Sequence, residues 1–427
     1  MNKGGGGDNE ESKIRNGEFI WTDKIGIVSH ADIDGRTRII SDYSNKVIIE
    51  SWEQGLLSAV RVPEKNDLIV YYTAPANRAN LASVAILEYI RMDKTLNPRE
   101  SFELLRIPQK NPIHNGGSLS FVGQDNLVLA VGDDNGNGHN RRYQGADHYL
   151  WSWRSSQHDD LPYGKLLIID ISDISTNPDR SYLVESNQFS GTSEYNSVDV
   201  PVVRSENISI QILAKGLRNP WSFDVQHSSI VIGDVGSSVP GELNYLPDVA
   251  TKQNFGWDVE ENSALNCSAD DIYLRKSITS NPLLFLNPFF YYDAIQNEFF
   301  SCTRTNKLTK PTGEIMTPVA SYPRSHEGRM IGQSIVVGSM LNEKMISGKY
   351  LFGDLRGEDG PTFFTTSMQF DYQQNRPQPI EIHGSNLGRN QHLLNIFDMQ
   401  NGETWVATTD FSDSGGSIHR LTSLTDA

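Results

Sequence analysis

The chain contains 427 residues, with 53 acidic against 37 basic side chains and a formal net charge of −16. This negative charge opposes binding to nucleic-acid phosphates and to anionic membranes, so neither is an expected partner. The 35 glycines and 19 prolines are spread along the whole chain. Because such residues separate short strands at turns, the composition favours an all-β fold.

The length alone would suit two or three domains, although closed all-β architectures routinely run longer as one unit. Residues 1–16 are polar and glycine-rich and lack the apolar stretch of a signal peptide, so we expect a disordered tail there. No run of the sequence approaches the roughly 18 apolar residues of a membrane span, which predicts a soluble protein. The remaining residues, 17–427, contain no obvious linker and are predicted to form one domain.

Five strongly β-prone runs recur along the chain, and each ends in a small or acidic turn. Their Val, Ile, Tyr and Trp residues suit buried strands, and the Gly-Asp or Thr-Asp that follows suits a tight loop. The runs begin near residues 67, 126, 229, 349 and 404. They are spaced by about one or two units of roughly 55–60 residues, close to the length of a propeller blade. Residues 164–172 and 416–421 supply candidate partner strands, as expected for four-stranded antiparallel blades.

The stretches between these runs are less regular. Residues 80–90 are compatible with a helix or with a strand, because they combine an apolar pattern with β-branched side chains. Segments 140–163, 180–207 and 260–312 are polar or irregular, and we expect long insertions that carry functional loops.

The chain has two cysteines, Cys267 and Cys302, at the two sides of one polar stretch. This arrangement permits a single disulfide that closes a loop, and it equally permits two free thiols. The sequence leaves both alternatives open.

Four segments, taken in order, carry a family resemblance. They are EQGLLSAV (53–60), IHNGGSLSF followed by LAVGDDNGN (113–137), GLRNPWSFDV with IGDVGSSVPGELNYL and NFGWDVEEN (216–262), and SGKYLFGDLRG (347–357). Together they resemble the soluble quinoprotein glucose/sorbosone dehydrogenase family, which includes aldose sugar dehydrogenases and the propeller of hedgehog-interacting proteins. The resemblance implies a six-bladed β-propeller with its functional site at the mouth of the central channel.

The resemblance also implies a pyrroloquinoline quinone (PQQ) cofactor, a calcium ion, and oxidation of the anomeric hydroxyl of a sugar. In the family's HNGG-like segment a histidine accepts the hydroxyl proton, and His114 matches it. Imidazole suits this role because it can take up a proton near neutral pH. A histidine at this place could also be a turn residue that bonds to neighbouring backbone.

Further matches concern the cofactor. Arg218 and Asn219 match the family's Arg-Asn pair that contacts it, and Gln54 matches a glutamine that hydrogen-bonds it. A fixed guanidinium stabilises the negative charge that a quinone gains with the hydride. Without the resemblance, Arg218-Asn219 would equally suit an Asx-type turn before a strand, and Gln54 an ordinary amide at a blade edge.

Calcium in the family is bound by backbone carbonyls at positions that match Gly236 and Ser237, with a serine where the family has proline. Hard cations accept carbonyl ligands whatever the side chain. Glu242 matches a carboxylate of a separate structural calcium site, although it also suits a solvated loop acid. By the same resemblance, Asp133 and Asp134 border the substrate side of the site.

The resemblance weakens toward the C-terminus, where the family pairs the cofactor's carboxylates with a lysine and with arginines. Arg356 stands at the place of the lysine and would keep the charge, but as a planar fork. The arginine-bearing loop is LGRNQHLLNIF (387–397), with His392 and Leu394 at the aligned positions and Arg389 as the nearby cation.

The leading hypothesis is therefore a PQQ- and calcium-dependent dehydrogenase of an aldose sugar, with a sugar substrate and an electron acceptor as partners. The alternative is a non-catalytic propeller that binds a protein or a glycan and whose cofactor site is degraded. A calcium-dependent hydrolase such as a lactonase would need several carboxylates that converge on one channel ion, and the sequence offers only scattered ones. The family and a Cys267–Cys302 disulfide would indicate an extracellular or periplasmic location.

Overall fold

The structure of the protein is a computed structural model, in which strands, mostly in antiparallel pairs, form most of the described residues. The residues that it describes are 18–32, 34–77, 81–134, 155–157, 161–176, 184–185, 203–204, 208–236, 241–257, 290–293, 298–301, 318–322, 325–326, 329–330, 332–341, 348–368, 380–384, 387–398, 403–410, 416–422 and 425–426. The predicted tail (1–16), Cys267, Cys302 and most of the three predicted insertions lie outside these residues.

The described residues gather into two compact units. The first extends to Pro220 and also includes Val225–Ser229 and Pro247–Lys252, and the second comprises the rest of the chain. The prediction of one domain over 17–427 stays a prediction.

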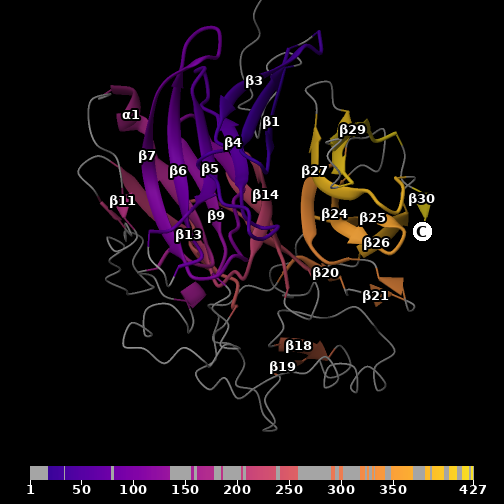
Figure 1. Ribbon diagram of the computed structural model, residues 1–427. Helices are drawn as coiled ribbons and strands as arrows, with labels where there is room; N and C mark the ends of the chain where they lie inside the picture. The colour runs from indigo at the N-terminus through magenta and orange to yellow at the C-terminus, as the bar shows by residue number, and fades with distance from the viewer. Residues whose placement is uncertain are drawn as a thin grey trace, which may run out of the picture. The chain divides into compact units, whose positions relative to one another are not determined.

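Three sheets belong mainly to the first unit (Figure 1). The first sheet has the order β1-β2-β3, with β1 (Phe19–Asp23), β2 (Ile27–Ala31) and β3 (Thr37–Asp42). The second has the order β11-β7-β6-β5-β4, with β4 (Leu56–Arg61), β5 (Leu68–Ala74), β6 (Ser83–Met92), β7 (Pro98–Gln109) and β11 (Val184–Glu185). The third has the order β12-β13-β10-β9-β8, with β8 (Leu119–Val122), β9 (Asn126–Val131), β10 (Lys165–Asp170), β12 (Val203–Arg204) and β13 (Ser209–Lys215). Two short helical turns accompany them, η2 (Ser155–Gln157) and α1 (Ser172–Thr176).

Further strands form sheets of two to five strands. One has the order β14-β15-β16-β20, with β14 (Pro220–Gln226), β15 (Ser229–Asp234), β16 (Gly241–Leu246) and β20 (Ala320–Tyr322). Another has the order β23-β24-β25-β26-β30, with β23 (Ile335–Met340), β24 (Lys349–Gly357), β25 (Gly360–Ser367), β26 (Ile380–Gly384) and β30 (Thr425–Asp426). Strands β27 (His392–Asp398), β28 (Thr404–Thr409) and β29 (Gly416–Arg420) form a meander. Two hairpins pair β18 (Phe290–Asp293) with β19 (Glu298–Ser301) and β21 (Ser325–His326) with β22 (Arg329–Met330), and β17 (Gln253–Asn254) is a two-residue strand.

The all-β prediction is confirmed, and the five β-prone runs form β5, β9, β15, β24 and β28. Of the two alternatives for residues 80–90, the strand is correct, because Ser83–Met92 is β6 and pairs with strands on both sides. The expectation of uniformly four-stranded sheets needs correction: the described sheets range from two strands upward. One reason is that β11 extends its sheet by pairing in parallel with β7. The count of six blades stays a prediction.

Both faces of the central strands are buried, which explains their nearly continuous apolar sequences. Successive side chains of a strand point to opposite faces of its sheet. In β5, Ile69 and Tyr71 therefore join one hydrophobic core, whereas Val70 and Tyr72 join another. Strand β24 repeats this pattern in the second unit. Because apolar cores cover both faces of these strands, polar residues that could form a functional site lie at the strand ends.

No helix among the described residues has the length and apolar character needed to cross a bilayer.

Candidate functional site

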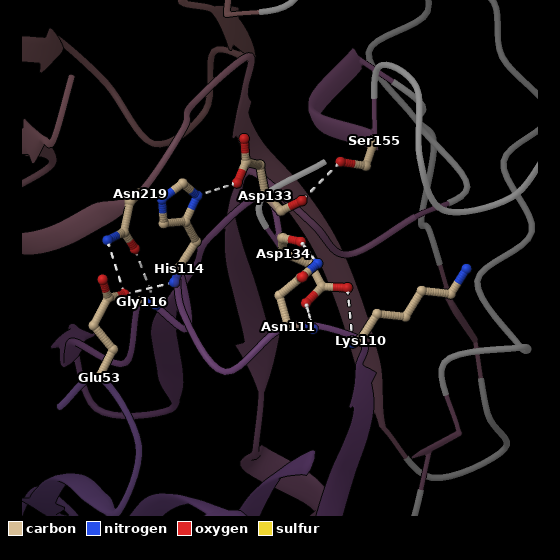
Figure 2. Close-up of polar contacts among 9 residues, drawn as sticks. All are labelled: Glu53, Lys110, Asn111, His114, Gly116, Asp133, Asp134, Ser155 and Asn219. Carbon is tan, nitrogen blue, oxygen red and sulfur yellow. Dashed lines mark hydrogen bonds and ion pairs between the residues drawn. The ribbon is translucent and has the colours of Figure 1, made fainter. Parts of the chain in front are cut away.

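Four chain segments meet at strand ends in the first unit (Figure 2). Glu53 precedes β4, His114 precedes β8, Asp133 follows β9, and Asn219 precedes β14. Backbone hydrogen bonds from Gly117 N to the Ala130 carbonyl and from Ala130 N to the Ser118 carbonyl, both 3.0 Å, hold the start of β8 against the end of β9. Residues far apart in the sequence thus form one polar cluster.

His114 lies at the centre of this cluster. Its side chain is 4% exposed, and its Nδ1 lies 2.5 Å from Oδ1 of Asp133. A carboxylate can only accept a hydrogen bond, so Nδ1 carries the proton and Nε2 becomes the basic nitrogen of the neutral ring. The backbone of His114 has a φ of 61°, a left-handed conformation that is uncommon for residues other than glycine. Such conformations persist where the surroundings enforce them, and they gather at functional sites.

Glu53 connects the histidine to Asn219. Its Oε2 accepts hydrogen bonds from the His114 backbone N (2.5 Å) and from Asn219 Nδ2 (3.2 Å). Oδ1 of Asn219 in turn accepts a bond of 3.3 Å from the backbone N of Gly116. The pair therefore clamps the segment that carries His114 from two sides. Both hydrogen bonds to the Glu53 carboxylate end on Oε2. Within the described part of the chain, Oε1 is therefore available to bind a ligand.

The clamp depends on a glycine at the end of β9. A Cβ atom at Gly132 would lie 2.1 Å from the carbonyl oxygen of His114 and 3.0 Å from Oδ1 of Asn219. Non-bonded carbon and oxygen atoms do not approach to 2.1 Å, so only glycine allows the backbone of His114 to pack here.

The backbone of Asp133 is also fixed. Its N donates to the carbonyl of Arg218 (2.7 Å), and its carbonyl accepts from Oγ of Ser155 in η2 (3.0 Å). The turn η2 is anchored by Lys165, which has no exposed surface and whose Nζ donates to the carbonyls of Ser155, Ser156 and Tyr163 at 2.7–3.0 Å. The backbone of Asp133 is thus bonded to η2, and η2 is bonded to the buried ammonium group of Lys165.

Asp134 and Asp133 are both buried, but their carboxylates have different partners. Its carboxylate accepts the backbone N–H groups of Lys110 and Asn111, each at 3.0 Å, and its own carbonyl accepts Nδ2 of Asn111 at 2.6 Å. Burial raises the pKa of Asp134 to about 8, although the two N–H donors act in the opposite direction. The negative charge of Asp133 adds to the rise. Asp134 therefore braces the 110–111 loop, and its place on the substrate side stays a prediction.

Gln54 forms no described hydrogen bond with the cluster that its neighbour Glu53 joins. It has no exposed surface, and its Oε1 accepts the backbone N of Ser51 at 3.1 Å, whereas its Nε2 has no partner in the described structure. Its predicted contact with a cofactor stays a prediction. Sequence reasoning missed Glu53. The sequence feature that could have indicated it is a carboxylate at the start of the first matched segment, shortly before β4.

Arg218 and Asn219 are placed together at the site, as adjacent residues. The Arg218 side chain is half-buried and its carbonyl binds the backbone of Asp133, while Asn219 is 3% exposed and binds Glu53. A guanidinium one residue from the clamp is a suitable partner for an anionic group.

The other predicted residues belong to the second unit and are described there alone. Glu242 in β16 lies directly opposite Asp234 in β15, and both are buried. Burial raises the pKa of Glu242 well above its ordinary range, and the charge of Asp234 raises it further. Two facing carboxylates in such a place would be stabilised by a cation. Gly236 is buried just after β15, whereas Ser237 lies outside the described residues.

Arg356 is exposed near the end of β24, where its backbone N donates to Oδ1 of Asp354 at 3.0 Å. Burial lowers the pKa of His392, and the positive charge of Arg356 acts in the same direction. Arg389 forms an exposed ion pair with Asp359 at 2.7 Å, and Leu394 is 42% exposed. In the second unit, Arg356 thus lies close enough to His392 to affect its titration, and its role toward a cofactor stays a prediction.

The donor set can be compared with what a quinone cofactor and calcium require. Alcohol oxidation needs a base, and Nε2 of His114 has the chemistry of one. An anionic quinone needs a cation, and Arg218 is a cation adjacent to Asn219 of the cluster. No group of three or more His, Cys, Asp or Glu side chains in the described part of the chain suits a metal ion. The calcium site implied by the resemblance uses backbone carbonyls, so the residues present fit it chemically.

Comparisons with known proteins agree with this architecture. No family model and no curated protein matches the sequence. Among solved structures, the fold is similar to the soluble aldose sugar dehydrogenase of Escherichia coli in its apo form, with a TM-score of 0.57 and 15% identity over 96% of this chain and 94% of that one. It is also similar to the PQQ-bound aldose sugar dehydrogenase of Streptomyces coelicolor, with a TM-score of 0.54 and 13% identity over 95% and 91% of the two chains.

A structure described as a glucose dehydrogenase matches with a TM-score of 0.56 and 14% identity over 94% of this chain and 92% of that one. At such low identity the likeness concerns the fold, and at that level the expected resemblance to sugar dehydrogenases is confirmed.

Proposed function

We propose that the protein is an oxidoreductase that oxidises the anomeric hydroxyl of an aldose sugar with PQQ and calcium. The observation that carries the proposal is the buried contact between Nδ1 of His114 and Asp133, 2.5 Å long, which leaves Nε2 as an oriented base. The similarity of the fold to sugar dehydrogenases supports the choice of substrate class.

The proton of the anomeric hydroxyl is transferred to residues of the protein. Nε2 of His114 takes the proton of the anomeric hydroxyl, and the carboxylate of Asp133 stabilises the imidazolium that forms. The clamp of Glu53 and Asn219 fixes the backbone of His114, so that little reorganisation accompanies the transfer. When bound, PQQ supplies the acceptor for the hydride from C1.

The residues that would hold the cofactor are Arg218 and Asn219 at the cluster, with Gln54 and Arg356. The carbonyls of Gly236 and Ser237 would bind the calcium ion that accompanies the quinone, and Glu242 with Asp234 would bind a separate structural calcium ion. This arrangement requires the two compact units to act as one six-bladed propeller over 17–427, with the site at the mouth of its channel. We propose an extracellular or periplasmic location and an external electron acceptor.

The second candidate function is a propeller that binds a protein or a glycan without catalysis. The observation that favours it is the surface ion pair of Arg389 with Asp359. Arg389 lies in the loop where the family has arginines that bind the cofactor, and here its charge is paired with an acid of the protein.

The test is reconstitution of the purified protein with PQQ and calcium, followed by dye reduction with a panel of aldoses. The His114→Asn variant should lose at least about 10²-fold in turnover, because general-base catalysis contributes that much. His227→Asn is a matched control, since His227 is exposed and has a φ of 60°, so the backbone cost is the same. An absence of quinone binding at saturating calcium would contradict the proposal and favour the binding propeller.

A further inference from the structure

An exposed tryptophan, Trp52, directly precedes Glu53 of the cluster in the chain. Trp52 is 68% exposed, although a large apolar side chain gains free energy from burial. Ile25 and Ile49 are 52% and 49% exposed. A Cβ atom at Gly55 would lie 2.3 Å from the Lys24 carbonyl oxygen and 3.0 Å from Cγ2 of Ile49, so these segments are packed together. The turn that carries Trp52 thus lies beside segments that expose further apolar side chains.

The turn that presents Trp52 is held rigidly. Gln54 N donates to the Ser51 carbonyl at 3.2 Å, which closes a four-residue turn with Trp52 at its second position. Ser51 N donates to Oε1 of Gln54 (3.1 Å), and Lys24 Nζ donates to the Ser51 carbonyl (2.7 Å). A rigid turn that exposes an indole holds it ready for a ligand at little entropic cost.

The same turn is bonded to the His114 segment on both sides of Trp52. Ser51 Oγ donates to the Pro112 carbonyl (2.5 Å), and Asn115 Nδ2 donates to the Glu53 carbonyl (2.9 Å). Consecutive Cα atoms are only about 3.8 Å apart, so Trp52 stands one residue from each of these contacts. The backbone of Trp52 is thereby held between two residues that contact the segment of the candidate base, one residue from the available Oε1 of Glu53.

A pyranose ring has the complementary chemistry, with C–H groups on its faces and hydroxyls around its edge. The C–H face packs against an aromatic ring, while carboxylates and amides bind the hydroxyls. We propose that Trp52 is a stacking subsite for the pyranose ring of the substrate. The inference rests on the proposed function and extends it. The nearby carboxylates of Glu53 and Asp133 favour a neutral sugar over an anionic one.

The experiment uses methyl β-D-glucopyranoside, which has no free anomeric hydroxyl and therefore binds without being oxidised at C1. Saturation-transfer difference NMR on the full chain without cofactor should show strong transfer to H1, H3 and H5, the protons of one ring face. Trp52→Ala should abolish this transfer, and Trp52→Phe should retain it. Trp21→Ala is the matched control, because Trp21 is also exposed (41%) but lies in β1.

A second readout uses the cofactor-loaded protein and an oxidisable aldose. Trp52→Ala should raise KM by about threefold to tenfold with kcat unchanged, in line with the energy of one aromatic contact. Unchanged KM and unchanged saturation transfer in Trp52→Ala would overturn the inference. The same holds if the wild-type protein transfers no saturation to the glycoside, including the case in which a protein partner covers Trp52.

Failure of the two proposals can be told apart. If stacking is observed and PQQ-dependent turnover is absent, the inference stands and the dehydrogenase proposal fails. If turnover is observed and is insensitive to Trp52, the dehydrogenase proposal stands and the stacking subsite is overturned.

Discussion

The contact between His114 and Asp133 determines which edge of the imidazole can react. With Nδ1 bonded to a carboxylate that is itself buried, the ring cannot flip without breaking this buried contact. His114 is therefore held in one orientation, and its proposed role as a base depends on the charge of Asp133 as much as on its own chemistry.

Replacing Asp133 by Asn should separate the effect of its negative charge from the effect of its shape and hydrogen bond. Asparagine still accepts the bond from Nδ1 but no longer stabilises the imidazolium, so turnover with PQQ, calcium and an aldose should fall by about 10²-fold or more. Steady-state dye reduction measures the loss. Asp125→Asn, in the exposed turn between β8 and β9, should leave turnover unchanged. Equal turnover in Asp133→Asn and the wild type would contradict the role of the carboxylate.

Asp134 predicts a pH dependence of stability. Its pKa is about 8 in the folded protein and about 4 in an unfolded chain. A raised pKa means that the folded state binds the proton more tightly, so its stabilisation is fully present below about pH 4 and is lost as the pH rises through 8. The slope from this group is at most about 1.4 kcal/mol per pH unit.

Urea unfolding between pH 5 and pH 9 measures this contribution, and the comparison with Asp134→Asn isolates it, because asparagine does not titrate. The difference in unfolding free energy between the two proteins should change steadily up to about pH 8 and then level off. A difference that is constant over this range would show that Asp134 is ionised in the folded protein.

At the scale of elements, the ends of β8 and β9 and the turn η2 form a layered support for the site. Lys165 in β10 satisfies three carbonyls around η2, and η2 in turn bonds to the backbone of Asp133. A buried ammonium with good partners is stable, but its removal leaves several buried acceptors without a donor.

Lys165→Met keeps the length of the side chain and removes these bonds. The unfolding free energy should fall by about 2–4 kcal/mol, since bonds to a charged group are the stronger ones. Chemical denaturation followed by tryptophan fluorescence measures the change. Lys94→Met, at an exposed position, should change stability by no more than about 0.5 kcal/mol. A loss in Lys165→Met as small as that of the control would contradict the anchoring role.

The elements show which features are accessible to sequence reasoning. Strands β5 and β9 follow from their β-prone sequences, and His114 followed from the HNGG motif before β8. Glu53 and Lys165 were missed because their importance comes from contacts across 61 and 10 residues with backbone atoms that no local pattern indicates. The parallel addition of β11 to β7 is similarly non-local, since it brings Val184 beside Leu105.

At the scale of the molecule, composition indicated the all-β class because glycine, proline and β-branched residues set the local geometry throughout the chain. The arrangement of the two compact units depends instead on long-range packing, which composition does not encode. The net charge of −16 is spread over a chain whose candidate site is itself rich in carboxylates. A neutral sugar is therefore a more suitable ligand than a phosphorylated one.

The most direct test of the central proposal follows the reduction of protein-bound PQQ by D-glucose and by D-glucose deuterated at C1, in the stopped flow with saturating calcium. We predict slower reduction with the deuterated sugar in the wild-type protein, and a rate at least about 10²-fold lower in His114→Asn with either sugar. Equal rates with both sugars, unchanged in His114→Asn, would contradict oxidation at C1 with His114 as the base.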